Sequence, residues 1–172
     1  MSAEPAATVR HAQPADAAAI AAIYNQGIEE RQATFETAPR AAADVEPWLA
    51  ARDSPPVLVA QERGAVRGWA RIVPYDERAA YAGVGEYGIY VDREARGHGL
   101  GRQLLDALAA EAEAHGYWKL IGLLFTDNEP SRALARACGF SDVGVHRRHG
   151  RLDGEWRDVV VVERLLGDAA PE

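Results

Sequence analysis

Cysteine is almost absent from this sequence. The chain of 172 residues holds one, Cys138, so a disulfide within the chain is excluded and a reducing compartment is favoured. No apolar run approaches the roughly 20 residues that a membrane-spanning helix needs, and Met1–Thr8 lacks the apolar stretch of a signal peptide. Positive charge is not in excess either, because the formal net charge is -7. We therefore expect a cytoplasmic protein that binds neither nucleic acid nor a membrane.

The patterns of two common kinds of site are missing too. The five histidines show no ligand spacing with Cys, Asp or Glu, so we expect no metal. A Walker loop needs a Gly-Lys-Ser/Thr end, which the glycine-rich stretch at 97–101 does not have. That stretch also lies in mid-chain, whereas a dinucleotide-binding loop follows the first strand of its domain.

What is present predicts one mixed α/β domain. Apolar residues form 48% of the chain and no linker divides it, so we place a single domain at residues 8–166, between flexible tails at 1–7 and 167–172. Strands are predicted at 8–12, 57–62, 66–73, 81–91, 118–124, 143–148 and 156–165. Helices are predicted after a cap at Asp16, from Asp44 with Pro47 in its first turn, over 100–115, and over 129–138 after a cap at Asn128. This order favours a mixed sheet with a helix leaving its centre.

The most informative stretch joins a strand to that central helix. Ile89-Tyr90-Val91 runs into Arg96-Gly97-His98-Gly99-Leu100-Gly101-Arg102, where the helix begins. Free backbone N–H groups at a helix start suit a pyrophosphate, and glycines let a ligand approach the backbone closely. The arginines and acids of residues 92–102 leave a local charge of 3 − 2 = +1, so geometry must supply most of the binding. The alternative is an ordinary strand–turn–helix corner with glycines for tightness.

The spacing Arg96-x-x-Gly99-x-Gly101 resembles the signature of the GNAT superfamily of N-acetyltransferases. The resemblance covers nearly the whole chain and implies the GNAT fold, in which a mixed and largely antiparallel sheet of about six to seven strands is flanked by helices. It implies acetyl-CoA as cosubstrate, with the backbone of Ile89, Tyr90 and Val91 beside the thioester. It also implies that residues 96–102 hold the pyrophosphate and that Asn128 and Ser131 contact the cofactor.

A narrower resemblance points to the phosphinothricin acetyltransferase branch. It rests on Pro74-x-x-x-Arg78-x-Ala80-Tyr81-x-x-x-x-Glu86, Asn128-x-Pro130-Ser131 and Gly154-x-Trp156-x-Asp158-Val159. Within that branch, Tyr24-Asn25-Gln26-Gly27-Ile28, Ala33-Thr34-Phe35 and Gly83-Val84-Gly85-Glu86 look most like arsinothricin N-acetyltransferases. The branch implies a homodimer that acetylates a small anionic amino-acid analogue and so detoxifies it.

Amide formation needs a base, because an α-amine is largely protonated at neutral pH. Glu86 matches the catalytic glutamate of the branch, and the alternative is a strand-end carboxylate held in a salt bridge. No general acid is assigned, because Ala135 stands where many relatives have tyrosine or histidine; water, Tyr81 or Tyr90 could serve instead. We expect Cys138 to be a core residue and not a nucleophile, since no histidine is spaced to activate it.

Candidate acceptor ligands gather around one arginine. Arg78 could bind a carboxylate or phosphinate through two parallel hydrogen bonds, and its alternative is an exposed loop arginine. Tyr81 and Phe35 could wall the same pocket. The basic run at 146–151 is most often a solvated face, but His149 or Arg151 could add positive charge to the pocket.

We therefore expect acetyl transfer from acetyl-CoA to a phosphinothricin- or arsinothricin-like amino acid. Methionine sulfoximine or sulfone is the competing acceptor within the branch. A non-catalytic acyl-CoA sensor is the alternative of another class, suggested by Ala135. A protein-modifying acetyltransferase would need an open groove for a peptide.

Overall fold

The computed structural model describes residues 7–171, and these form seven strands, four α-helices and four short 3-10 turns. The strands are β1 (Thr8–His11), β2 (Leu58–Glu62), β3 (Ala65–Pro74), β4 (Val84–Val91), β5 (Lys119–Phe125), β6 (Ser141–Leu152) and β7 (Glu155–Leu165). The helices are α1 (Ala17–Glu30), α2 (Ala42–Ala50), α3 (Leu100–Ala114) and α4 (Glu129–Ala137). The 3-10 turns are Pro14–Asp16, Ala79–Tyr81, Arg93–Ala95 and Gly167–Ala169. None of the helices in this part of the chain has the length and apolar character that crossing a membrane requires.

The strands form one sheet in the order β1-β2-β3-β4-β5-β7-β6. Only β4 and β5 are parallel, and every other neighbouring pair is antiparallel. The prediction of a mixed, largely antiparallel sheet is therefore confirmed. The final hairpin is also confirmed, although β6 is longer than predicted and contains the whole basic run at 146–151.

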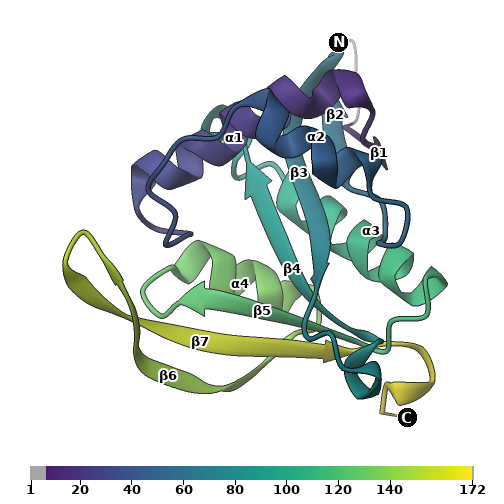
Figure 1. Cartoon of the computed structure of the whole chain (residues 1–172), viewed down its shortest axis with the longest axis vertical. Coiled ribbons are helices and arrows are strands. Elements are labelled where there is room, and N and C mark those ends of the chain that lie inside the picture. Colours follow the sequence, from purple (N-terminus) through teal and green to yellow (C-terminus); the bar gives the residue numbers. More distant parts are fainter. Residues whose placement is uncertain (1–6, 172) are drawn as a thin grey trace.

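The centre of the sheet is split. β4 pairs with β5 over three residues only, from Val84 opposite Lys119 to Glu86 opposite Ile121. Beyond Glu86, β4 stays with β3 as far as Val91 while β5 stays with β7, and the two strands diverge (Figure 1). The edge of β4 past Glu86 is consequently open to a ligand.

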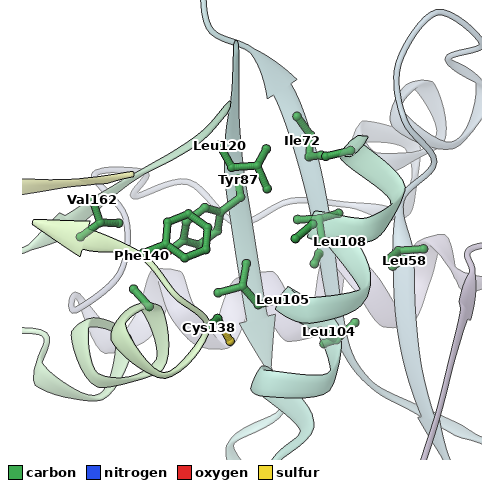
Figure 2. Packing of buried hydrophobic residues seen from close by; sticks show 14 of the residues in the cluster. Leu58, Ile72, Tyr87, Leu104, Leu105, Leu108, Leu120, Cys138, Phe140 and Val162 are labelled. Carbon is green, nitrogen blue, oxygen red and sulfur yellow. The ribbon is translucent and has the colours of Figure 1, made fainter. Parts of the chain in front are cut away.

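Two helical layers cover the sheet. Successive strand residues point to opposite faces, and in β3 Trp69 packs under α1 and α2 while Ala70 and Ile72 face α3. The α3 stripe of Leu104, Leu105 and Leu108 is fully buried in the larger cluster (Figure 2). This packing anchors both the strand that enters the glycine-rich loop and the helix that leaves it.

Three local predictions are wrong in detail. The Asp16 carboxylate does not cap α1, because it is bound by Arg10 at 2.7 Å and by the N–H of Gln13. The second helix begins at Ala42, so Pro47 lies in its second turn. Tyr81 is not in β4: the chain turns at Ala79–Tyr81, and the strand begins only after Gly83, which packs against the Trp118 ring.

Apart from β6, which ends four residues later than predicted, the remaining elements fall within two residues of the predicted ranges. Residues 1–6 and 172 of the predicted tails lie outside the described residues, and Gly167–Ala169 forms a 3-10 turn. The single-domain boundary at 8–166 stays a prediction, although one sheet runs from Thr8 to Leu165.

Candidate active site

The glycine-rich loop presents free amides where α3 begins. Gly97 and Gly99 have φ of +81° and +84°, and a Cβ on either would face open space. Gly99 is the N-cap residue and has no side chain with which to cap the helix. Among residues 7–171, none accepts a hydrogen bond from the N–H groups of residues 99–102. Converging unpartnered amides at a helix start are what a diphosphate needs, so the loop fits the cofactor that the sequence predicts.

A cavity of about 470 Å³ lies against this loop. Its lining includes eleven of the twelve predicted cofactor residues: Ile89, Tyr90, Val91, Arg96, Gly97, Gly99, Leu100, Gly101, Arg102, Asn128 and Ser131. His98 is exposed and does not contribute to this lining. Arg96 is tied down by Glu30 at 3.0 Å and by the Val91 carbonyl at 3.1 Å, so its side chain braces the loop.

The opposite wall of the cavity is the start of α4. Asn128 caps that helix as predicted, because its Oδ1 accepts a hydrogen bond from the Ser131 N–H at 3.2 Å. Its Nδ2 donates to the Gln32 carbonyl at 2.8 Å, which fixes the segment after α1 against α4. Asn128 therefore joins two walls that are almost a hundred residues apart in the sequence.

A second cavity of about 360 Å³ lies further along the split sheet and contains Glu86. The two cavities share six lining residues: Ala33, Ile89, Tyr90, Asn128, Ser131 and Leu134. They therefore adjoin along the open edge of β4. A molecule held by its phosphates at the α3 loop could extend along this edge towards Glu86.

Glu86 lies where β4 and β5 separate, and its carboxylate is unpaired. It is the last β4 residue that pairs with β5, it is half-buried, and no described residue forms an ion pair or hydrogen bond with its side chain. Burial raises the pKa of the Glu86 carboxyl above its ordinary value. The alternative of a salt-bridged strand end therefore finds no partner in residues 7–171. A desolvated, unpaired carboxylate is well suited to accept a proton.

The predicted acceptor residues separate into two groups. Phe35 and His149 line the cavity of Glu86, with the Phe35 ring 4.9 Å from that of Phe125. Arg78, Tyr81 and Arg151 do not line it in the single chain.

Local partners explain why these three residues lie elsewhere. Arg78 is 70% exposed and is held by Asp76 at 2.9 Å, with its guanidinium 4.7 Å from the Tyr81 ring centre. Arg151 lies 4.1 Å from the ring centre of Trp156. The role of all three in acceptor binding stays a prediction.

Sequence reasoning missed Arg71. It is a half-buried β3 residue that lines the cavity and lies directly opposite Gly88 of β4. Its guanidinium carbon lies 3.6 Å from the Trp48 ring centre, and burial lowers its pKa. The usable signal was period-two alternation, since Arg71 shares a face with the buried Trp69 in an otherwise apolar strand.

The general acid that the resemblance would place in α4 is absent. Ala135 is fully buried in the core, and its methyl side chain carries no proton that could be donated to the thiolate. Tyr90 lines both cavities, and burial raises the pKa of its phenol, whereas Tyr81 lies outside them. Either water or Tyr90 is left to supply the proton.

Cys138 lies in the large apolar cluster (Figure 2), and burial raises the pKa of its thiol to about 11. The prediction that it is a core residue is confirmed. No group of three or more His, Cys, Asp or Glu side chains within residues 7–171 is arranged to hold a metal.

Comparison with known proteins identifies the family. The model of the acetyltransferase (GNAT) family matches residues 20–140. The chain is 33% identical over 164 residues to the phosphinothricin N-acetyltransferase of Streptomyces viridochromogenes, a match covering 95% of this chain and 90% of that protein. It is 32% identical over 163 residues to the L-methionine sulfoximine/L-methionine sulfone acetyltransferase of Pseudomonas aeruginosa, a match covering 93% of this chain and 95% of that protein.

A solved structure with a similar fold carries the cosubstrate that the sequence predicts. The crystal structure of a phosphinothricin acetyltransferase from Sinorhizobium meliloti in complex with acetyl-CoA is similar with a TM-score of 0.87 and 34% identity. The similarity covers 94% of this chain and 89% of that one. The free amides of the α3 loop agree with the ligand that this neighbour carries. The chain therefore belongs to the acetyltransferase (GNAT) family and is an acetyl-CoA-dependent N-acetyltransferase.

Proposed function

We propose that the acceptor is the α-amine of a small anionic amino-acid analogue of the phosphinothricin or arsinothricin type, and that its acetylation serves detoxification. The observation that carries this proposal is the unpaired Glu86 carboxylate, which lies in a cavity of amino-acid size adjoining the cofactor cavity. The name of the Streptomyces relative supports this acceptor class. The name of the Pseudomonas relative supports methionine sulfoximine or sulfone as the second candidate.

Each group where β4 and β5 separate has one role in the reaction. Glu86 takes the proton from the acceptor amine, directly or through one water, so that the nitrogen can attack the thioester. Beyond Glu86, β4 no longer pairs with β5, so the backbone at Gly88–Val91 is free on that side. It supplies an N–H to the thioester oxygen. Water or the Tyr90 hydroxyl returns a proton to the departing thiolate, which needs little help because a thiol has a pKa of about 8.5.

A thiol-release assay separates this enzyme from a non-catalytic acyl-CoA sensor. The purified chain is supplied with acetyl-CoA and, in turn, phosphinothricin, arsinothricin, methionine sulfoximine and methionine sulfone. We expect release with at least one of them, and a loss of about 10²- to 10⁴-fold in Glu86→Gln at unchanged acetyl-CoA affinity. Calorimetric binding of acetyl-CoA without release from any amine would favour the sensor. Release with methionine sulfone alone would favour the second candidate acceptor.

We also propose that the active form is a homodimer in the cytoplasm, where the free thiol of Cys138 stays reduced. Its support is the β6–β7 edge of the sheet, where Val143, Val145 and Trp156 are 58%, 53% and 49% exposed. Light scattering after gel filtration should give twice the chain mass for the wild type and one chain mass for Val145→Glu. A monomeric wild type at micromolar concentration would refute the dimer.

A further inference from the structure

We propose that Arg71 binds the α-carboxylate of the acceptor and thereby positions its amine at Glu86. This inference rests on the proposed function, since it names the residue that selects an amino acid from among other amines. Arg78, the arginine that the sequence favours for this role, lies outside the cavity.

The strand register places Arg71 beside Glu86. Arg71 pairs with Gly88, and the next pair on the same face is Val73 with Glu86. Residues two apart in a strand are separated by about 7 Å, so the arginine and the glutamate occupy adjacent rows. A molecule of amino-acid size can therefore contact both side chains at once.

The position opposite Arg71 is open. A Cβ built on Gly88 would meet no heavy atom within 4 Å. Directly opposed residues of an antiparallel pair project to the same face, so this vacant space lies beside the Arg71 side chain. The glycine leaves a slot between Glu86 and Tyr90, with Arg71 across from it.

The charges of the cavity leave Arg71 without a counterion. Glu36, the other acid in the lining, is paired with Arg40 at 2.9 Å. His149 is stacked on His146 at 4.6 Å. No described residue forms an ion pair with Arg71, whose contact with Trp48 occupies the face of the guanidinium and leaves its N–H groups at the edge.

A second donor lies on the same strand face. The indole Nε1 of Trp69 is buried and has no hydrogen-bond partner among the described residues, and Trp69 also lines the cavity. Unpartnered buried donors are uncommon in folded proteins. An acceptor carboxylate could satisfy both the Arg71 guanidinium and this indole.

The test compares methionine sulfone with its α-carboxamide, which keeps the amine but lacks the anionic group. Arg71→Met and Arg71→Gln remove the charge, and Arg71→Lys keeps the charge without the planar fork. Arg78→Met tests the alternative ligand, and Arg52→Met, at an exposed arginine that lines neither cavity, is the matched control. Binding is followed by tryptophan fluorescence, which Trp48 and Trp69 make sensitive to this site, and turnover is followed by thiol release.

We expect Arg71→Met and Arg71→Gln to weaken methionine sulfone binding, and to raise its KM, by about 10- to 100-fold. Arg71→Lys should lie in between. Carboxamide binding, acetyl-CoA affinity and the Arg52→Met values should stay close to those of the wild type.

Equal loss for the acid and the carboxamide would overturn the assignment, because it would show that Arg71 only supports Trp48. A selective loss in Arg78→Met instead would overturn it as well. If the wild type binds methionine sulfone in an Arg71-dependent way but releases no thiol with phosphinothricin, arsinothricin, methionine sulfoximine or methionine sulfone, the proposed function fails and the Arg71 site stands. If turnover occurs but does not depend on Arg71, the Arg71 site fails and the proposed function stands. A wild type that neither binds nor acetylates any of these four amino acids refutes both.

Discussion

The two adjoining cavities are built from different materials. The cofactor cavity uses the backbone of one continuous stretch, in which Gly97 and Gly99 expose amides at the start of α3. The acceptor cavity uses side chains brought together from β3, β4, β6 and the segment after α1. Peptide groups serve any chain that binds the same cofactor, whereas side chains differ from one chain to the next. The fold therefore accounts for the acetyl donor, and the acceptor is decided by a few substitutable residues.

Two carboxylates, those of Asp16 and Glu86, differ in whether they have a charged partner. Asp16 is buried, and the hydrogen bond from Arg10 holds the pKa of its carboxyl below the ordinary value. Glu86 has no partner, so desolvation raises the pKa of its carboxyl. A charge with a partner supports the fold, and a charge without one is available for chemistry.

The largest expected effect tests Glu86 as a base. The ratio of wild-type to Glu86→Gln activity should be about 10²- to 10⁴-fold at alkaline pH. It should fall by about tenfold for each pH unit below the raised pKa of Glu86, because the protonated wild type then resembles the amide. Taking the ratio cancels the titration of the acceptor amine. A ratio that does not change between pH 9 and pH 4, measured by thiol release, would remove Glu86 from the role of base.

The next largest effect is expected from filling the open space at Gly88, opposite Arg71. Gly88→Val should lower kcat/KM for the acceptor by about 100-fold, since its side chain fills the space in which the acceptor lies. Acetyl-CoA affinity should persist, because valine keeps the backbone N–H of residue 88 and its side chain enters only the acceptor cavity. Ala65→Val is the control, because it adds a branched side chain to an exposed residue of β3 that lines neither cavity. Equal losses in the two variants would point to a general effect of adding a side chain to the sheet.

Changing the backbone of the phosphate loop should have a smaller effect. Gly99→Ala puts a Cβ on a residue with φ of +84°, which costs about 1–2 kcal/mol. The loop can relieve that strain by turning its amides away, so acetyl-CoA should bind about tenfold more weakly by calorimetry. Gly64→Ala carries the same strain at φ of +81° in the β2–β3 turn. Gly64→Ala should lower the melting temperature without changing acetyl-CoA affinity. A loss of affinity in Gly64→Ala would contradict the claim that the backbone of the glycine-rich loop binds the cofactor.

The cofactor cavity, which is formed by backbone groups, was the one that could be predicted from the sequence. Its residues are consecutive, and glycines before an apolar helical stripe predict a free helix start without knowledge of the rest of the fold. The acceptor cavity needed the register of β3 against β4, which places Arg71 opposite Gly88. The sequence favoured Arg78 alone, and the structure shows Asp76 holding that side chain at the surface. The Asp16 cap failed for a similar reason, because Arg10 binds that carboxylate from the neighbouring strand.

The smallest effect concerns stability. Because the pKa of Glu86 is raised on folding, its carboxyl favours the folded state fully below the unfolded pKa of about 4.3 and loses that advantage as pH rises through the folded pKa. Gln does not titrate. Glu86→Gln should therefore melt at a higher temperature than the wild type at pH 8, and the difference should shrink as the pH approaches 4.

Asp16→Asn should behave in the opposite way. The pKa of Asp16 is lowered on folding, so its contribution is present above the unfolded pKa of about 3.9 and is lost as pH falls through the folded pKa. The variant should destabilise the protein at pH 7 and much less at pH 3. If both variants lowered the melting temperature at pH 8, Glu86 would have a partner that stabilises its charge, and it would no longer be a carboxylate left free for the acceptor amine.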